Sequence, residues 1–213
     1  MKRRSFATGL LAASAGLGQA AAWAQQAFRA GKDYLTLERP VPTDAGPGKV
    51  ELIEFFWYSC PHCNAFEPTF AQWIKNAPKE VVVRRVPVAF RDDFAPQQRL
   101  YYTLEAMDLL DTIHAKVFHA VHVERLPLNT DALIQAWIEK QGVDGKKFAD
   151  TYKSFGVAGK VKRAVQLQNE FRVEGVPSLG IAGRYYTDGS LAGGMERALK
   201  VAESLLAQSR AAR

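Results

Sequence analysis

The chain contains only two cysteines, and both lie in the run Cys60-Pro61-His62-Cys63. Residues 50–58, just before this run, are mostly apolar and predict a buried strand. Residues 64–74, just after it, predict a helix. Cys60 therefore begins a helix directly after a strand. At that position free backbone N–H groups and the helix dipole favour a thiolate. Pro61 suits the first helical turn because it has no N–H to leave unpaired.

This arrangement points to redox chemistry at the two cysteines. Cys60, at the helix terminus, is the candidate nucleophile, and Cys63 is the candidate resolving thiol. His62 lies between them and adds a positive charge beside the sulfur when it is protonated. The alternative is a structural disulfide. Closing so small a loop removes little chain entropy, so such a bridge would stabilise the fold only slightly.

Residues 1–24 predict a secretory signal peptide that is cleaved after Ala24. The segment begins with Met1-Lys2-Arg3-Arg4, continues through small and apolar residues, and ends in Ala22-Trp23-Ala24, a cleavage signature. Its apolar part is short for a membrane span. The arginine pair leaves two export routes open, the general one and the twin-arginine one.

The charge of the chain is only mildly positive once the predicted signal peptide is set aside. The sequence has 28 basic and 22 acidic residues, a formal net charge of +6, and three of the basic residues lie in the first four positions. The remaining chain carries +3. Such a balance argues neither for nor against a polyanionic ligand, and we expect no nucleic-acid partner.

The rest of the chain alternates between strand and helix signals. Residues 80–88 predict a second strand, which Pro87 ends or places at a sheet edge. Residues 95–171 show helical spacing and no strong strand. A hairpin follows at residues 178–187, and a last helix spans residues 195–206. The helical segment is either an insertion into an α/β unit or a separate domain. The returning hairpin favours an insertion, because two strands alone are marginally stable.

These features resemble the DsbA family of periplasmic thiol:disulfide oxidoreductases. The resemblance rests on the segment from Glu54 to Cys63, on the helical segment and on the run Gly175-Val176-Pro177. It implies an α/β thioredoxin fold with an inserted all-helical domain. The thioredoxin-like domain is expected at residues 25–92 and 165–213, and the insertion at residues 93–164.

The resemblance also implies how substrate is held. Pro177 is expected to be cis and to face the cysteine pair, which leaves the Val176 backbone free to pair with an extended substrate segment. The alternative is an ordinary trans proline at the start of a strand.

Three charged residues are expected to support the cysteines. By resemblance, Glu54 lies beneath the disulfide and shuttles the proton of Cys63, whereas the alternative is a partly solvated strand end. Glu67 and Arg85 are expected to form a nearby, mostly structural ion pair.

Three histidines lie in the helical segment, at His114, His119 and His122. A zinc site needs about four well-placed ligands, and no cluster of acids or cysteines completes one here. We expect these histidines at surface or partly buried helix positions, and no metal site.

The implied function is the oxidation of dithiols in newly exported proteins, in the periplasm, through a mixed disulfide at Cys60. The Cys60–Cys63 disulfide is itself the redox group, so no further cofactor is expected. The implied partners are unfolded exported proteins with free cysteines and a DsbB-like membrane oxidase that restores the disulfide. The chain is expected to be a monomer.

Other interpretations stay open on the same residues. The chain could be a disulfide isomerase or reductase, although residues 25–47 leave no room for an added dimerisation domain. It could be an oxidase dedicated to one partner. It could also be a non-enzymatic chaperone in which Cys60 and Cys63 form a structural bridge.

Overall fold

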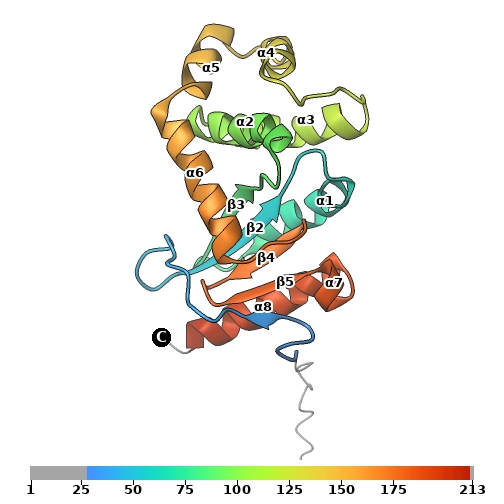
Figure 1. Cartoon of the computed structure of the whole chain (residues 1–213). Coiled ribbons are helices and arrows are strands. Elements are labelled where there is room, and N and C mark those ends of the chain that lie inside the picture. Colours follow the sequence, from blue (N-terminus) through green and yellow to red (C-terminus); the bar gives the residue numbers. More distant parts are fainter. Residues whose placement is uncertain (1–27, 212–213) are drawn as a thin grey trace, which may run out of the picture.

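The computed structural model of the protein describes residues 28–211. The signal peptide predicted at residues 1–24 lies outside them. Figure 1 shows a sheet in the lower half of the molecule and a block of helices above it. Within the described part of the chain, no helix is long and apolar enough to cross a membrane.

The sheet has five strands in the order β1-β5-β4-β2-β3. β2 lies between β4 and the edge strand β3 and pairs in parallel with β3, whereas the other neighbouring strands are antiparallel. Every residue of β2 is buried, which accounts for its mostly apolar sequence. The second predicted strand is confirmed at the sheet edge, and it ends at Pro87. The strands are β1 (Leu35–Thr36), β2 (Val50–Phe56), β3 (Val81–Pro87), β4 (Ser178–Ile181) and β5 (Tyr185–Asp188).

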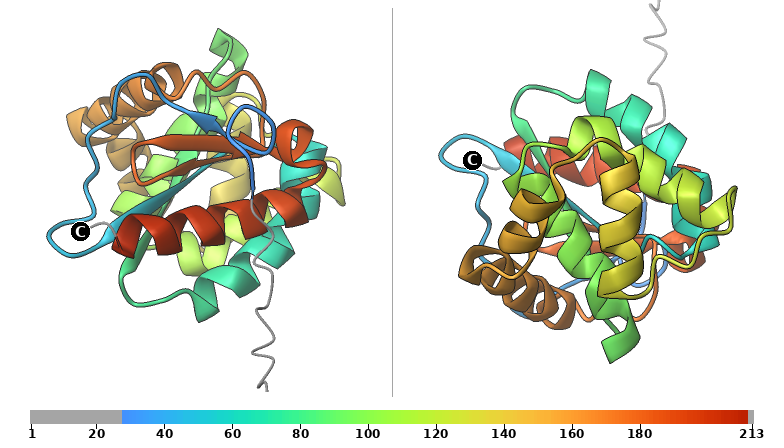
Figure 2. Two further views of the ribbon diagram at one scale, coloured as in Figure 1. Left: turned by 90° about the horizontal axis from the view of Figure 1, so that it is seen from below. Right: turned by 90° about the horizontal axis from the view of Figure 1, so that it is seen from above.

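Two helices, α1 (Pro61–Asn76) and α8 (Met195–Ala211), cover one face of the sheet. Seen from below, α8 runs alongside the β4–β5 hairpin (Figure 2, left). Val50 and Leu52 of β2 meet Phe70 of α1 and Leu205 of α8 in one buried cluster. Each such side chain contributes about 1.5–3 kcal/mol by leaving water. This packing fixes the direction of α1, and therefore the place of the cysteines at its start.

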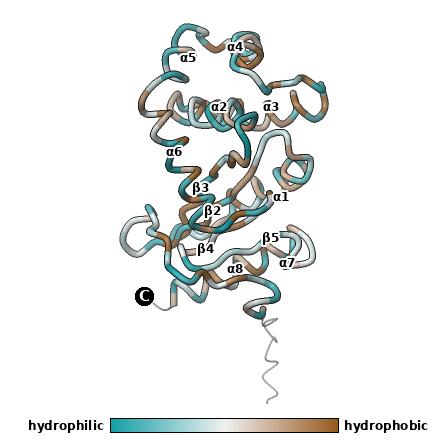
Figure 3. The backbone as a smooth tube through the Cα atoms, viewed as in Figure 1, coloured by the Kyte–Doolittle hydropathy of each residue, from teal (hydrophilic) through white to brown (hydrophobic). Residues whose placement is uncertain are grey.

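The opposite face of β2 belongs to a second cluster, which continues into the helical block. Phe55 packs against Phe171, with ring centroids 5.3 Å apart, where the chain leaves the block. Figure 3 shows hydrophobic positions both in the strands and in the helical block above them, in keeping with this cluster. The odd-numbered and even-numbered residues of β2 thus point to different faces of the sheet, as a pleated strand requires.

The helical block lies between β3 and β4 in the sequence and stands above the sheet (Figures 1 and 2). Side-chain oxygens of Thr130, Asp144 and Ser154 cap three of its helices. The elements are the 3₁₀ helix η1 (Asp92–Phe94) and the helices α2 (Ala95–Ala106), α3 (Leu110–His122), α4 (Asp131–Lys140), α5 (Gly145–Tyr152) and α6 (Phe155–Glu170).

The architecture is a thioredoxin fold with a helical insertion, as the sequence predicts. Several boundaries differ. β2 ends at Phe56 rather than at residue 58, because residues 57–59 form the turn that leads to Cys60. A short helix, α7 (Gly189–Ala192), follows β5 and was not expected. The domain boundary predicted at residues 164–165 falls inside α6, and the division into two domains stays a prediction.

Candidate functional site

The site begins at the N-terminus of α1, where Cys60 is the N-cap residue and Pro61 the first helical residue. The two cysteines are free thiols in this structure. The side chain of Cys63 and the backbone N–H groups of Cys63 and His62 donate hydrogen bonds to the Cys60 sulfur. These hydrogen bonds outweigh burial and lower the pKa of Cys60 from 9.0 to about 6. Cys60 is therefore mostly thiolate at neutral pH.

Cys63 has the opposite character. It is 1% exposed, against 7% for Cys60. Burial, and then the hydrogen bond with Cys60, raise its pKa far above the ordinary value. When both cysteines are reduced, the negative charge therefore lies on Cys60 and the proton stays on Cys63. The structure separates the two sulfurs as the sequence predicts for a nucleophile and a resolving thiol.

The loop before β4 closes over the cysteine pair. The Val176–Pro177 peptide bond is cis, as the resemblance implies. The Cys60 sulfur lies 3.3 Å from the carbonyl oxygen of Val176, across 116 residues of sequence, and donates to it when the thiol is protonated. The structure thus brings the two ends of the predicted site into contact.

A groove of about 330 Å³ lies beside this contact. His62 lines it, and its side chain is exposed. The rest of the lining comes from the Val176–Pro177 loop and from the segment around α7, namely Gly175, Val176, Pro177, Asp188, Gly189, Ser190, Gly194 and Met195. A protonated His62 also lowers the pKa of Cys60 through its charge, although this effect is smaller than that of the hydrogen bonds.

Three predicted charged residues, Glu54, Glu67 and Arg85, form one cluster of low exposure. Glu54 on β2 is 2% exposed, and its Oε2 lies 3.2 Å from Nε of Arg85 on β3. The two atoms are not aligned as a hydrogen bond, since both lack a hydrogen-bond partner. Arg85 Nη2 donates to Glu67 Oε1 at 2.9 Å, so the ion pair predicted between Glu67 and Arg85 is confirmed.

The two carboxyl groups titrate in opposite directions. Burial raises the pKa of Glu54 to about 8, and the charge of Arg85 offsets this only in part. Burial also opposes ionisation of Glu67, but the His114 imidazole, whose Nε2 lies 3.5 Å from Glu67 Oε2, and the charge of Arg85 together lower its pKa. Near neutral pH this cluster therefore holds one proton, on Glu54, and one carboxylate, on Glu67.

His114 lies deeper in the structure than its sequence pattern predicts. It is 4% exposed on α3, so the prediction of a surface or partly buried position is wrong for this residue. Its Nδ1 lies 2.7 Å from the hydroxyl of Tyr58, and its Nε2 lies 3.5 Å from Glu67 Oε2. The helical spacing of His114 with Val117 and Phe118, both buried, is the signal that was available.

The turn before Cys60 is held by the helical block. Gln97 of α2 donates to the Ser59 hydroxyl at 2.7 Å and to the Leu128 carbonyl at 2.9 Å. His122 of α3 lies 2.8 Å from the Tyr58 carbonyl, which places this histidine as a partly buried residue of the site. No sequence pattern indicates these contacts, because they join segments that are about 30 to 60 residues apart.

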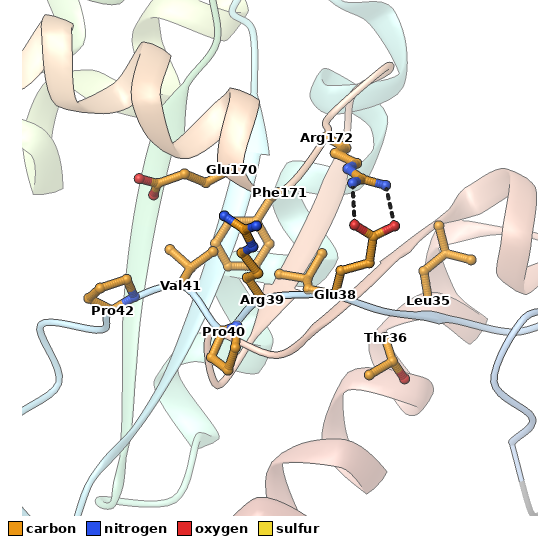
Figure 4. Close-up of a pocket in the computed structure, with 11 residues that line it drawn as sticks. Leu35, Thr36, Glu38, Arg39, Pro40, Val41, Pro42, Glu170, Phe171 and Arg172 are labelled. Carbon is orange, nitrogen blue, oxygen red and sulfur yellow. Dashed lines mark hydrogen bonds and ion pairs between the residues drawn. The ribbon is translucent and has the colours of Figure 1, made fainter.

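A larger cavity, of about 690 Å³, lies away from the cysteines. Figure 4 shows the segment around β1 on one side of it and the end of α6 on the other. The Arg172 guanidinium donates to the Glu38 carboxylate at its rim. Because neither cysteine lines this cavity, the groove beside His62 is the candidate substrate site.

Residues 28–211 contain no group of three or more histidine, cysteine or acidic side chains placed to hold a metal ion. The chemistry that the described site supports is thiol–disulfide exchange. It offers a thiolate, a protonated partner thiol and an adjacent acid that can move a proton.

Comparisons with known proteins agree with this geometry. A model of the DSBA-like thioredoxin domain family matches residues 51–201. The thiol:disulfide interchange protein DsbA of Bordetella pertussis is 42% identical over 211 residues, covering 99% of this chain and 100% of that protein. Its namesake from Pseudomonas aeruginosa is 38% identical over 210 residues, with 99% and 98% covered. The crystal structure of Pseudomonas aeruginosa DsbA matches with a TM-score of 0.83 at 39% identity, covering 87% of this chain and 96% of that one.

Proposed function

The chain belongs to the DSBA-like thioredoxin domain family, and we propose that its Cys60–Cys63 disulfide oxidises dithiols in newly exported proteins. Its relatives of the same length are named thiol:disulfide interchange proteins. The observation that carries the proposal is the unequal state of the two thiols. A low pKa at Cys60 stabilises the reduced protein, so the disulfide is a strong oxidant and accepts electrons readily.

The reaction balances as two exchange steps. A substrate thiolate attacks the Cys60 sulfur, the Cys60–Cys63 bond breaks, and Cys63 leaves as a thiolate that takes up a proton. A second substrate thiolate then attacks the substrate sulfur of the mixed disulfide and releases Cys60 as a thiolate. The substrate loses two electrons and gains a disulfide, and the enzyme disulfide is reduced to two thiols. Low-pKa thiolates are good leaving groups, so the second step favours release at Cys60.

Glu54 supplies the proton for the first step. The ionised form of Glu54 raises the pKa of Cys63, which means that the two groups interact. Burial keeps Glu54 itself mostly protonated at neutral pH. When Cys63 leaves, the proton passes to its sulfur and Arg85 stabilises the resulting Glu54 carboxylate. Reoxidation reverses this transfer. Glu67 and Arg85 support the exchange by fixing the charge around it.

The loop at Val176 and Pro177 binds the substrate. The Val176 carbonyl already lies against the Cys60 sulfur, so an extended segment that pairs with this backbone would bring its cysteine to Cys60. Backbone pairing does not depend on sequence, which suits many unfolded clients. His62 lines the groove, and its charge, when it is protonated, stabilises the Cys60 thiolate.

The protein acts in the periplasm as a monomer. Residues 1–24 direct its export, residues 25–92 and 165–213 form the redox domain, and residues 93–164 form the helical insertion. Its partners are unfolded exported proteins with free cysteines and a DsbB-like membrane oxidase that restores the disulfide. The redox-active disulfide serves in place of a separate cofactor. The similarity to DsbA proteins supports the redox role, and the other assignments follow from the sequence.

The test uses the mature protein, oxidised, and a reduced peptide with two cysteines. We expect one disulfide formed in the peptide for each enzyme disulfide lost, measured by mass spectrometry. Cys60→Ser should abolish this transfer, and His119→Gln, an exposed position on α3, should leave it unchanged. Efficient rearrangement of a wrongly paired substrate, without net oxidation of the dithiol peptide, would instead identify an isomerase.

A further inference from the structure

His114 lies inside the interface between the helical block and the redox site. Its ring is 4% exposed and is surrounded by the rings of Phe56, Tyr58, Tyr101 and Phe118. Their centroids lie 5.3–5.8 Å from that of the imidazole. A polar ring in such an apolar setting is costly unless its nitrogens have partners. Both of its nitrogens face polar groups that belong to the redox side of the interface.

The two ring nitrogens contact different groups. Nδ1 lies 2.7 Å from the Tyr58 hydroxyl, and Nε2 lies 3.5 Å from Glu67 Oε2. The second contact is not aligned as a hydrogen bond, so Nε2 is a buried atom without a hydrogen-bond partner. When the Tyr58 hydroxyl donates to Nδ1, the neutral imidazole must carry its proton on Nε2. That proton then points toward Glu67.

The buried acids Glu54 and Glu67 share a single arginine, so their ionisation is coupled. One cation, Arg85, stands 3.2 Å from Glu54 and 2.9 Å from Glu67. Two buried carboxylates beside one cation leave a negative charge uncompensated, so one of the two acids retains a proton. A donor placed beside only one of them decides which acid ionises. His114 is such a donor, and it faces Glu67.

We propose that His114 is a positioning residue that keeps Glu67 ionised and thereby leaves the exchangeable proton on Glu54, next to Cys63. The inference rests on the proposed function, because it concerns the proton that moves when the disulfide opens and closes. His114 does not touch the cysteines. It acts through Glu67 and Arg85.

The titration of the surrounding groups is consistent with this role. Burial lowers the pKa of His114, which keeps the imidazole neutral. The titratable and charged groups that face it are Tyr58 before α1, Tyr101 on α2, Glu67 on α1 and Arg85 on β3. Burial raises the pKa of each tyrosine, so both hydroxyl groups stay protonated at neutral pH. Neither tyrosine therefore takes part in sharing the proton between Glu54 and Glu67.

The test compares His114→Leu, which removes both nitrogens, with His114→Gln, which keeps a side-chain donor. The mature protein is labelled with carbon-13 at the glutamate carboxyl groups, and Glu54 and Glu67 are titrated by NMR. In His114→Leu we expect the Glu67 midpoint to rise and the Glu54 midpoint to fall, each by about one pH unit. His114→Gln should recover part of both shifts. His119→Leu is the matched control, because His119 lies on the same helix with its side chain 59% exposed.

A kinetic measurement links the titration to the reaction. Glutathione is attached to Cys60 as a mixed disulfide, and its release by Cys63 is followed as a function of pH. The midpoint of this profile should move to lower pH in His114→Leu, in parallel with Glu54. A purely structural role for His114 would change stability and leave the midpoint unchanged, which would overturn the proposal.

Tyr58→Phe provides a second route if His114→Leu does not fold. It removes the hydroxyl that fixes the imidazole proton on Nε2, so both glutamate midpoints should shift in the same directions by a smaller amount. Unchanged midpoints would contradict the proposal. Oxidation of the dithiol peptide at pH 7 is measured on the same samples. If the wild type does not oxidise the peptide, the proposed function is wrong. If it does oxidise the peptide but the glutamate midpoints do not shift in the variants, only the role of His114 is rejected.

Discussion

Two acidic residues of β2, Glu51 and Glu54, are equally buried and yet behave differently. Each is 2% exposed, and each contacts an arginine of the neighbouring strand β3. They lie three positions apart, so the pleat sends them to opposite faces of the sheet. Glu54 faces α1 and the cysteines, whereas Glu51 faces the segment that precedes β2.

The surroundings of Glu51 satisfy its charge. Arg84 bridges it to Asp44, at 3.4 Å and 2.6 Å, and the Asp44 backbone N–H donates to it as well. Asp44 is 73% exposed and Arg84 is 24% exposed, so water reaches this cluster. Burial still raises the pKa of Glu51, but these contacts counteract the rise.

The surroundings of Glu54 leave it poorly satisfied. Its Oε2 has no hydrogen-bond partner, and its arginine is shared with Glu67. Burial raises its pKa to about 8. The comparison teaches that burial alone does not mark a functional acid. The same strand, exposure and type of partner give a well-satisfied acid at Glu51 and, at Glu54, an acid with an unsatisfied oxygen that we propose as the proton carrier.

The largest expected effect concerns stability against pH. The pKa of Glu54 is about 8 in the folded protein and 4.5 in its ordinary state, so between these values the folded protein holds a proton that the unfolded chain has lost. The free energy of unfolding therefore falls as pH rises from about 5 to 8. Glu54→Gln removes this loss, and we expect it to stabilise the reduced protein by about 3 kcal/mol at pH 8 and by little at pH 5. Urea unfolding of the wild type and the variant at pH 5 and pH 8 measures this stabilisation. An equal change in the free energy of unfolding at the two pH values would contradict the raised pKa of Glu54.

The next effect is on rate. Without the Glu54 carboxyl group, the proton of Cys63 must pass to water, so we expect Glu54→Gln to slow the release of glutathione from Cys60 by about 10-fold at pH 7. Glu51→Gln is the matched control on the same strand and should leave the rate unchanged. Stopped-flow fluorescence follows the step. If both variants slowed the release equally, the rate would depend on a buried acid anywhere in β2 and not on the position of Glu54 near Cys63.

The smallest effect is expected from the stability of Glu51→Gln. Gln keeps an acceptor for the Asp44 N–H, and water still reaches the partly exposed Arg84. We expect its free energy of unfolding to stay within about 1 kcal/mol of the wild type from pH 5 to 8. A pH-dependent change as large as that of Glu54→Gln would remove the distinction between the two acids.

The sequence predicts local features of this molecule better than its long-range contacts. The cysteine motif, the strand before it and the helix after it follow from apolar spacing and from the chemistry of a helix N-terminus. Glu54 was identifiable as a carboxylate in an apolar strand. Glu51 has the same signature, and the sequence does not distinguish it from Glu54. The donors that satisfy Glu51 come from Asp44 and Arg84, and their placement beside it depends on the fold.

Other contacts lie beyond what sequence patterns can show. The pairing of Ile53 with Gly180 joins strands that the helical block separates, and no local signal sets that register. His114 looked like an ordinary helix residue, because its partners Tyr58 and Glu67 lie on other elements. The cis Val176–Pro177 bond was expected from family resemblance and not from any spacing.

The central claim is that the stabilised Cys60 thiolate makes the disulfide oxidising. Its pKa of about 6 against an ordinary 9.0 means that the stabilisation is complete above pH 9 and is lost as the pH falls toward 6. The most direct test is the reduction potential of the mature protein, equilibrated with glutathione at pH 7. We predict a value above about −180 mV, more oxidising than protein disulfide isomerase. A value near that of thioredoxin, about −270 mV, would contradict the account.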